Sequence, residues 1–217
     1  MTALTQNFPR IGRPDQQDIL SIIKQMNLAG TFVEIGTFGG HFAFDMMAAC
    51  NPQKLYCVDP YATYDNFKDA LNSEPLEDVY NEAKQRLLPF GDKVEFLRMY
   101  SEEAASRFAD ESLDFVYIDG NHRYAYALKD FECWFPKLRN GGLLCGDDAT
   151  DGEDDSQRNE EGDVVRVWTR NAAGEPQSWG HYGVLKAARE FTQKRGLQLY
   201  QVGTQCVIFK GRDLVIA

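Results

Sequence analysis

The chain has 217 residues, a formal net charge of −10 and 43% hydrophobic residues. This length and composition suit one globular domain with a single core, and nothing in the sequence marks a second domain within residues 1–217. The acidic balance argues against nucleic acid as a partner, because phosphate binding needs a basic face. The expected partner is therefore a small molecule.

No segment predicts export or membrane insertion. The first residues lack the basic and apolar regions of a signal peptide, and no apolar run reaches membrane-spanning length. The five cysteines are odd in number, scattered and without metal-type spacing, so we expect reduced thiols. These features predict a cytoplasmic protein without membrane contact, and they leave a homo-oligomer open.

Helical and strand-like patterns alternate along most of the chain. In the first half, apolar spacing predicts helix, strand, helix, strand, helix and strand, at residues 15–26, 31–35, 42–49, 54–59, 76–88 and 94–97. The first of these helices belongs to a predicted N-terminal helical extension, residues 1–29. The second half is predicted to contain a short helix, a strand, a helix, a strand, a helix and two strands, at residues 102–108, 115–118, 124–138, 143–146, 184–194, 197–202 and 206–210.

The alternation predicts an α/β fold, a doubly wound Rossmann-like sheet with helices on both faces. The last two strands are joined by only Gly203-Thr204-Gln205, too few residues for a parallel crossover, so they should form an antiparallel hairpin. Residues 149–181 have no regular pattern and are predicted to be a loop, rich in acid at 151–163 and then in aromatic residues. An acidic run is usually solvated surface, whereas aromatic residues would suit a wall over a substrate.

A glycine-rich turn follows the first predicted strand, at Glu34-Ile35-Gly36-Thr37-Phe38-Gly39-Gly40. Glycine lets the backbone approach a ligand closely and also serves ordinary turns, so both interpretations stay open. The dinucleotide fingerprint fails, because Phe38 and His41 stand where it requires glycine, and this argues against NAD. Asp59 ends the second strand, where an acid can accept hydrogen bonds from a ribose diol. Together these features indicate a cofactor that contains a nucleoside.

Three aspartates follow two other predicted strands. Asp119 comes after residues 115–118, and Asp147 and Asp148 come after residues 143–146. The carboxyl ends of neighbouring parallel strands meet at one edge of a sheet, and converging carboxylates repel each other unless a cation lies between them. A hard divalent cation is the natural candidate, although an ordinary polar strand end stays open. His122 titrates near neutrality and suits a base, or is simply a solvent-facing helix residue.

On these residues the chain resembles class I S-adenosylmethionine-dependent methyltransferases, whose fold is a seven-stranded sheet with a closing antiparallel hairpin. The turn at residues 34–40 matches the acid-x-Gly-x-x-x-Gly variant of the family's first motif, and Asp59 falls on its ribose-binding acid. Tyr100-Ser101-Glu102 falls where the family often contacts adenine, and the resemblance is strong over residues 30–148. It implies that S-adenosylmethionine is bound by Glu34, Gly36, Thr37, Gly40, Asp59, Ser101 and Asp119.

Two metal-using groups fit best: catechol O-methyltransferases, and the sugar O-methyltransferases of macrolide and aminocoumarin biosynthesis. They place one Asp after strand four and an Asp-Asp or Asp-Asn pair after strand five, which implies a magnesium-type site at Asp119, Asp147 and Asp148. Some of the sugar enzymes have a catalytic histidine three residues after the first of these aspartates, which implies that His122 is the base. The acidic insertion at residues 151–163 is not part of this pattern.

The expected function is therefore magnesium-dependent O-methyl transfer from S-adenosylmethionine to a hydroxyl of a small molecule. Two adjacent hydroxyls would chelate the ion, so a diol on a sugar or an aromatic ring is favoured as acceptor. The predicted loop at residues 149–181 would lie over the acceptor site. Two alternatives stay open: a metal-independent small-molecule methyltransferase, and a non-catalytic scaffold that binds S-adenosylmethionine.

Overall fold

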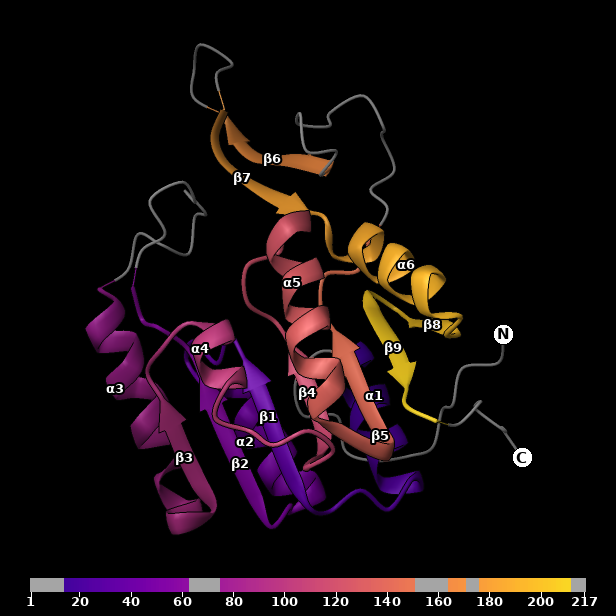
Figure 1. The fold of residues 1–217 in the computed structure, drawn as a ribbon. Helices are drawn as coiled ribbons and strands as arrows, with labels where there is room; N and C mark the ends of the chain where they lie inside the picture. The colour runs from indigo at the N-terminus through magenta and orange to yellow at the C-terminus, as the bar shows by residue number, and fades with distance from the viewer. Residues whose placement is uncertain (1–13, 63–74, 151–163, 171–175, 212–217) are drawn as a thin grey trace.

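The computed structural model describes residues 14–62, 75–150, 164–170 and 176–211. The main sheet contains seven strands: β1 (Thr31–Ile35), β2 (Lys54–Val58), β3 (Val94–Leu97), β4 (Leu113–Ile118), β5 (Leu138–Gly146), β8 (Leu199–Val202) and β9 (Gln205–Phe209). Their order across the sheet is β3-β2-β1-β4-β5-β9-β8. The first five run parallel, whereas β9 runs antiparallel to both β5 and β8 (Figure 1). The predicted seven-stranded, mostly parallel sheet with a closing antiparallel hairpin is confirmed.

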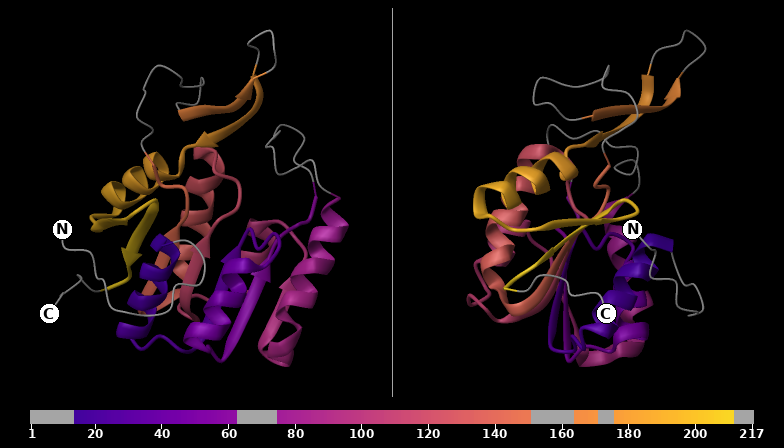
Figure 2. Two further views of the ribbon diagram at one scale, coloured as in Figure 1. Left: turned by 180° about the vertical axis from the view of Figure 1, so that it is seen from behind. Right: turned by 90° about the vertical axis from the view of Figure 1, so that its right-hand side faces the viewer.

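Helices cover both faces of this sheet. They are α1 (Pro14–Gln25), α2 (His41–Cys50), α3 (Leu76–Leu87), α4 (Ser101–Ala105), α5 (Tyr124–Trp134) and α6 (Val184–Arg195). The first three lie on one face and the last three on the other, as the views from behind and from the side show (Figure 2). Each strand of the middle of the sheet is therefore buried on both sides, as expected for a doubly wound fold.

Successive residues of a strand point to opposite faces, so the sheet separates two cores. In β4, Phe115 and Tyr117 pack with α1 and α2, whereas Val116 and Ile118 pack with α5 and α6. The apolar face of α1 is fully part of the first core, because Ile19, Leu20, Ile22 and Ile23 are all buried. The N-terminal helix predicted from the sequence is therefore an integral layer of the fold.

The helix ends follow from local sequence. α3 has Glu77 and Asp78 in its first turn, where negative charge suits the helix dipole. α6 has Lys194 and Arg195 in its last turn and ends at Gly196, whose φ of 62° is the left-handed conformation that glycine adopts without strain. These signals explain why the predicted ends of both helices lie within one residue of the observed ones.

Two predicted boundaries are wrong by four or more residues. The helix predicted over residues 124–138 ends at Trp134, because the following Phe135–Lys137 turn is a 3-10 helix, η3, that contains Pro136. β5 begins at Leu138 and not at residue 143. Two backbone hydrogen bonds join the early part of β5 to Lys210, the residue after β9. The N–H of Gly141 donates to the carbonyl of Lys210 at 2.7 Å, and the N–H of Lys210 donates to the carbonyl of Gly142 at 3.0 Å.

The stretch predicted as an irregular loop, residues 149–181, contains a second small sheet. β6 (Val164–Arg170) and β7 (Pro176–Tyr182) pair antiparallel, with Val164 opposite Tyr182. This hairpin lies beyond the carboxyl ends of the parallel strands (Figures 1 and 2). The acidic part of the predicted loop, residues 151–163, lies outside the described residues.

Two further sequence expectations concern the thiols and the membrane. All five cysteines are free, and three of them (Cys57, Cys145 and Cys206) are buried, as expected for reduced thiols. Within the described ranges, none of the helices has both the length and the apolar character needed to span a bilayer.

Candidate active site

The residues that follow the parallel strands are held side by side at the carboxyl edge of the sheet. The backbone N–H of Gly36 donates to the carbonyl of Val58 at 2.8 Å, and that of Asp119 donates to the carbonyl of Ile35 at 2.8 Å. The N–H of Asp147 donates in the same way to Ile118. The sheet pairing thus continues one residue past β1, β4 and β5, and it brings the glycine turn and the two aspartate positions together.

The glycines of the turn after β1 have structural reasons of their own. Gly36 has a φ of 83°, and a Cβ atom placed there would lie 2.1 Å from the carbonyl oxygen of Asp119. Gly40 has a φ of 73°, and its Cβ would meet Ala83 of α3 at 3.3 Å. The turn therefore needs glycine to pack against β4 and α3, whatever ligand approaches it.

Asp59 joins the turns after β1 and β2. Its Oδ2 accepts the backbone N–H of Phe38 at 2.9 Å, and its Oδ1 accepts that of Tyr61 at 2.8 Å. The Tyr61 hydroxyl in turn donates to the carbonyl of Phe38 at 2.8 Å. Burial raises the pKa of Asp59, and the two backbone N–H groups oppose that rise. The carboxylate is thus fixed in orientation at the place that the sequence predicts for a ribose contact.

Glu34 and Thr37 carry polar atoms that are buried without a partner. Their side chains are 2% and 4% exposed, and within the described part of the chain neither Glu34 Oε2 nor Thr37 Oγ1 has a hydrogen-bond partner. Burial raises the pKa of Glu34 well above its usual value, and the charge of Asp119 raises it further. A buried polar atom without a partner is costly, so this corner of the site is suited to a ligand that donates hydrogen bonds.

Ser101, at the start of α4, is held from inside the protein. Its hydroxyl donates to Asp130 Oδ1 at 2.5 Å and accepts the indole N–H of Trp134 at 2.8 Å. Burial raises the pKa of Asp130 to about 7, although the hydrogen bond from Ser101 lowers it. The Ser101 hydroxyl, which the sequence predicts to lie near adenine, is therefore already hydrogen-bonded to Asp130 and Trp134. At the carboxyl edge, Ser101 forms the first residue of α4.

His122 lies between two of the three predicted metal ligands. Its Nε2 is 3.2 Å from Asp119 Oδ1, and its Nδ1 is 3.2 Å from Asp148 Oδ2. Burial lowers the pKa of this imidazole, but the hydrogen bond to Asp119 and the surrounding carboxylates outweigh it, so the net shift is upward. Burial and the nearby Asp147 raise the pKa of Asp119, and His122 opposes that rise. The ring thus acts as the cation that these two carboxylates need.

Asp147 faces a different partner. It is 2% exposed, and its Oδ1 accepts both the side-chain amide of Gln205, at 2.5 Å, and the backbone N–H of Asp148, at 2.7 Å. Asp148 itself has a φ of 51°, an unusual conformation for a residue with a side chain. Across residues 14–62, 75–150, 164–170 and 176–211, no three His, Cys, Asp or Glu side chains are grouped closely enough to hold a metal ion.

The segment that carries His122 is fixed at both ends. Asn121 Oδ1 accepts the N–H of Arg123 at 3.1 Å, which sets the turn before α5. The carbonyl of His122 accepts the N–H of Gly183 at 2.8 Å, so the start of α6 is joined directly to this segment. The side-chain nitrogen of Asn121 is buried and has no partner among the described residues. His122 therefore occupies a stiff turn that faces the carboxyl edge.

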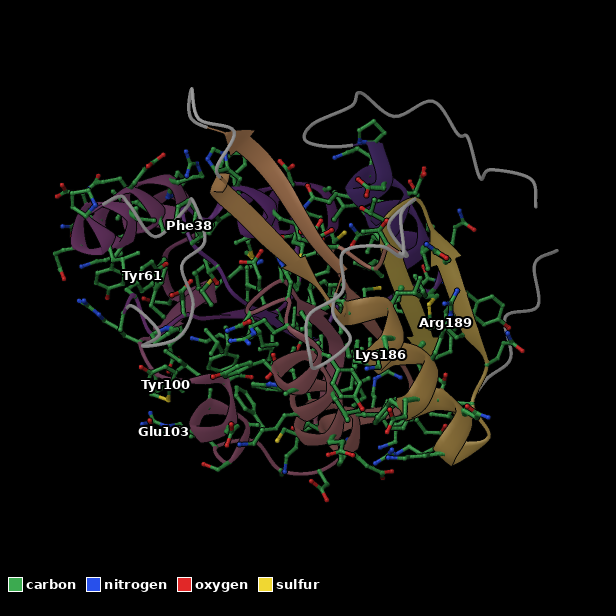
Figure 3. The ribbon with its side chains drawn as sticks, turned by 90° about the horizontal axis from the view of Figure 1, so that it is seen from above. Phe38, Tyr61, Tyr100, Glu103, Lys186 and Arg189 are labelled. Atoms are coloured by element: carbon green, nitrogen blue, oxygen red, sulfur yellow. The ribbon has the colours of Figure 1, made fainter. Side chains whose placement is uncertain are left out.

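The view along the carboxyl edge separates two halves of this surface. In Figure 3, Phe38 and Tyr61 lie together on one half and Tyr100 lies farther along the same half. These three residues follow β1, β2 and β3. Lys186 and Arg189 of α6 lie on the other half (Figure 3). The predicted cofactor residues thus gather on the first half, and β4 and β5 carry the aspartates toward the second.

The sequence interpretation missed Asp130 and Gln205. The signal for Gln205 was its place in the β9 sequence Gln-Cys-Val-Ile-Phe, in which all five residues are buried. A glutamine in a fully buried strand must find hydrogen-bond partners, and that requirement singles it out. Asp130 gave a similar signal, since it lies among the buried residues of α5.

The sheet order and the site at its carboxyl edge define a doubly wound α/β protein of the class I methyltransferase type. A family profile described as a methyltransferase domain matches residues 33–149, more than half of the chain. The chain therefore belongs to this methyltransferase family. The matched region begins in β1 and ends just past Asp148, so it includes the glycine turn and both aspartate positions.

One curated relative is similar over part of the chain. The uncharacterized protein R132 of Acanthamoeba polyphaga mimivirus is 30% identical over 125 residues, which is 56% of this chain and 52% of that protein. The chain thus spans about half the length of the relative it matches. The relative is itself named as uncharacterized, so this match suggests no activity for the chain.

Solved structures with the same fold include several O-methyltransferases. A putative caffeoyl-CoA O-methyltransferase from Staphylococcus aureus has a TM-score of 0.60 and 19% identity, covering 92% of this chain and 84% of that one. TomG from Streptomyces achromogenes, an O-methyltransferase of tomaymycin synthesis solved with SAM, has a TM-score of 0.56 and 16% identity, covering 93% and 82%. A Bacillus cereus O-methyltransferase solved with SAH has a TM-score of 0.55 and 16% identity, covering 93% and 84%. At such identities the similarity to these structures shows the fold alone. The predicted resemblance to class I methyltransferases is therefore confirmed for the fold by these structures and for the family by the profile match.

Proposed function

We propose that this protein transfers a methyl group from S-adenosylmethionine to a hydroxyl of a small molecule. Membership of the family supports methyl transfer, and O-methyltransferases are among the solved proteins that share the fold. The observation that carries the choice of a hydroxyl is His122, an imidazole at the carboxyl edge one strand away from the glycine turn. A hydroxyl that accepts a methyl group loses its proton, and an imidazole is the side chain best suited to receive it.

The cofactor would lie along the ends of β1, β2 and β3. Glu34 and Thr37 offer buried atoms without partners to a ligand that donates hydrogen bonds, and the fixed carboxylate of Asp59 suits the ribose diol. Gly36 and Gly40 let the turn pack closely against Asp119 and α3, which holds its backbone at the carboxyl edge, and Ser101 begins the helix near which adenine would lie. Asp119 completes the predicted set at the end of β4.

The chemistry that the bound cofactor supplies is a methyl group on a positively charged sulfur, open to in-line attack by an oxygen. The task of the protein is to align the acceptor oxygen with that methyl group and to take up the hydroxyl proton. Both ring nitrogens of His122 face carboxylates at 3.2 Å, so neither is turned toward an acceptor. Acceptor binding must therefore separate the ring from Asp119 or from Asp148, and the protonated ring must first give up one of its own protons, before His122 can receive the proton of the hydroxyl.

We extend the proposal to a divalent metal ion, of the magnesium type, held by Asp119, Asp147 and Asp148. The donor atoms are of the right kind, because all three residues offer carboxylate oxygens and a hard cation prefers oxygen ligands. Among the described residues no three such side chains are grouped closely enough to hold an ion, so binding requires these carboxylates to move together. Bound there, the ion would orient the acceptor hydroxyl and lower its pKa. The ring of His122 now bridges Asp119 and Asp148, so those two carboxylates can face an ion only when the ring leaves the bridge.

The same bridge favours a second candidate, a metal-independent methyltransferase. A protonated His122 ring between Asp119 and Asp148 already relieves the repulsion that would otherwise call for a metal ion. In that mechanism the aspartates would bind a polar acceptor directly. A non-catalytic scaffold that binds S-adenosylmethionine is the remaining alternative, and methyl transfer to any acceptor would exclude it.

The test is a screen for S-adenosylhomocysteine release, with diol-bearing sugars and catechols as acceptors and magnesium present. Release with one of them supports the proposed function, and its loss in excess EDTA supports the metal. Full activity in excess EDTA would refute the metal and leave the metal-independent reaction. Asp147→Asn and Asp119→Asn should weaken metal binding, with activity partly recovered at high metal concentration.

The role of His122 is tested by substitution with alanine. His122→Ala should bind S-adenosylmethionine normally and lower kcat by about 10²–10⁴-fold, the usual contribution of a general base. His41→Ala is the matched control, because His41 is an exposed histidine at the start of α2 and should leave kcat unchanged. Wild-type turnover in His122→Ala would show that another group, water or an aspartate, takes the proton.

We also propose that residues 149–181 cover the acceptor, which is supported by the position of the β6–β7 hairpin beyond the carboxyl ends of the strands (Figure 1). Deletion of residues 151–163 should leave the affinity for S-adenosylmethionine intact and change KM or kcat for the acceptor. Unchanged acceptor kinetics would make that acidic segment ordinary solvated surface. A single domain, a cytoplasmic location and a homo-oligomer stay predictions from the sequence.

A further inference from the structure

A fully buried glutamine holds the first aspartate of the Asp147-Asp148 pair. Gln205, in β9, is 0% exposed, and its side-chain nitrogen donates to Asp147 Oδ1 at 2.5 Å and to Asp15 Oδ2 at 3.2 Å. Its side-chain oxygen accepts the hydroxyl of Tyr117 at 2.8 Å. Both amide hydrogens therefore point at carboxylates. The opposite orientation of the amide would direct its oxygen at the same two carboxylates, so Gln205 has a single acceptable orientation.

The start of helix α1 supports this glutamine from behind. Asp15 Oδ2 also accepts the hydroxyl of Thr204 at 2.5 Å, and the side-chain nitrogen of Gln16 donates to the Tyr117 hydroxyl at 3.3 Å. The β8–β9 turn packs directly on the helix, because a Cβ atom at Gly203 would lie 2.7 Å from the Cβ of Asp15. The network thus joins segments that are 190 residues apart in the sequence.

The same turn holds the backbone just after Asp148. The N–H of Ala149 donates to the carbonyl of Thr204 at 2.7 Å, and the side chain of Gln201 donates to the carbonyl of Ala149 at 2.9 Å. Asp148, between these bonds and the Asp147 carboxylate, keeps its unusual φ of 51°. Such conformations persist only where the surroundings enforce them. The β8–β9 hairpin therefore fixes the Asp147 side chain and the backbone of the next two residues.

We propose that Gln205 is a positioning residue for the reaction, and that it acts by fixing the Asp147 carboxylate and, through it, Asp148. The inference rests on the proposed function, since it assigns Gln205 to the same site. Asp119 repels Asp147, and the hydrogen bonds that meet on Asp147 Oδ1 oppose a rotation away from that charge. The start of α1 also helps to hold the site, because Asp15 accepts a hydrogen bond from Gln205.

The first variant is Gln205→Met, which keeps the length of the side chain and removes both donors. We expect kcat for methyl transfer to fall about 10- to 100-fold, the usual effect of removing a group that orients a site residue. The dissociation constant for S-adenosylmethionine should stay within about twofold, because Gln205 is not among the residues after β1, β2 and β3. An unchanged calorimetric stoichiometry would show that the variant remains folded. Gln198→Met is the control, since Gln198 is exposed and its side chain donates to the carbonyl of the neighbouring Leu199.

A second pair of variants keeps the test independent of folding in Gln205→Met. Asp15→Asn retains an oxygen that can accept from both Gln205 and Thr204, so it should keep nearly wild-type kcat. Asp15→Leu removes that acceptor and should lower kcat, though less than Gln205→Met does. A merely structural role for Asp15 would reduce thermal stability in Asp15→Leu and leave kcat of the folded protein unchanged.

Hydrogen exchange supplies a readout that needs no activity. The N–H of Asp148 donates to the same oxygen of Asp147 that Gln205 holds, so in Gln205→Met its exchange should be at least about tenfold faster. The N–H of Gly141, in β5, donates to the carbonyl of Lys210 and should keep its wild-type rate. A similar acceleration of both amides would indicate general loosening and would count against a specific role for Gln205.

The outcomes separate this inference from the proposed function. Slower turnover with normal cofactor binding and faster Asp148 exchange would support both. Wild-type turnover in Gln205→Met would overturn the inference and leave the proposed function standing. If the wild-type protein transfers no methyl group to any acceptor, the proposed function fails. The positioning of Asp147 by Gln205 is then decided by the exchange rate of Asp148 alone, and an unchanged rate would refute it.

Discussion

Replacement of Asp130 by asparagine should change how the stability of the fold depends on pH. Asp130 is 6% exposed, lies in α5 and accepts the Ser101 hydroxyl at 2.5 Å. Asparagine has nearly the same shape and can accept that same hydrogen bond through its side-chain oxygen. The variant therefore removes the titration of the carboxyl group and leaves its main contact in place.

The expected size follows from the pKa. Burial raises the pKa of Asp130 from 3.8 to about 7, so the folded protein holds this proton over a range in which the unfolded chain has lost it. The stability that this group contributes is complete below its unfolded pKa and is lost as the pH rises through its folded pKa. The whole loss is about 4 kcal/mol at about 1.4 kcal/mol per pH unit, and about half of it falls between about pH 5.5 and 8.

The assay is urea unfolding at several pH values in that range, which stays above the sequence pI of about 4.8. The free energy of unfolding of Asp130→Asn, relative to the wild type, should rise by about 2 kcal/mol from pH 5.5 to 8. Asp92→Asn is the control, because Asp92 is exposed and its variant should follow the wild-type curve. Parallel curves for Asp130→Asn and the wild type would show that Asp130 is ionised throughout, and the reasoning from burial would be wrong.

Two further substitutions test the cofactor half of the site. Asp59→Ala should weaken binding of S-adenosylmethionine by about 1.5–3 kcal/mol, the range for lost hydrogen bonds to a charged group, and unchanged affinity by calorimetry would contradict the ribose assignment. Gly36→Ala should lower the free energy of unfolding by more than about 2 kcal/mol, because its new Cβ would lie 2.1 Å from the Asp119 carbonyl oxygen at a φ of 83°. Gly196→Ala is the matched control, with a φ of 62° in the left-handed helical region and no atom within 4 Å of its Cβ, and should lose only about 1 kcal/mol; equal losses would show that packing against Asp119 costs nothing.

The order of elements could be predicted from the sequence because each buried segment carries a local pattern. β1 and β3 have their predicted bounds, since both are short apolar or β-branched runs between turn residues. β7 could not be predicted in this way, because Pro176 and Gly180 are residues that usually interrupt strands. Residues 139–142 of β5 are polar or glycine, and backbone hydrogen bonds to Lys210 help to make them part of the strand. Tertiary contacts decided both cases.

The candidate site likewise has one part that the sequence could predict and one part that depends on tertiary contacts. The approach of Asp119 and Asp148 to His122 was accessible from the sequence, because parallel strands deliver their carboxyl ends to one edge. The bond from Gln205 to Asp147 was not, because it depends on which strand lies next to β5 and on the direction in which that strand runs. No local pattern encodes a contact between a helix at the beginning of the chain and a strand near its end, such as that of Asp15 with Gln205.

Main-chain hydrogen bonds tie both ends of the segment that carries β6 and β7 to the rest of the fold, from Ala149 to Thr204 and from Gly183 to His122. β6 and β7 pair with each other and not with the seven-stranded sheet, so replacing this hairpin would leave the strand order of the main sheet unchanged. Lengthening a loop between fixed ends costs little, since the closure entropy grows only slowly with length. If this segment covers the acceptor, as proposed, its exchange between related proteins would change the preferred acceptor and leave the residues at the carboxyl edge of the sheet in place.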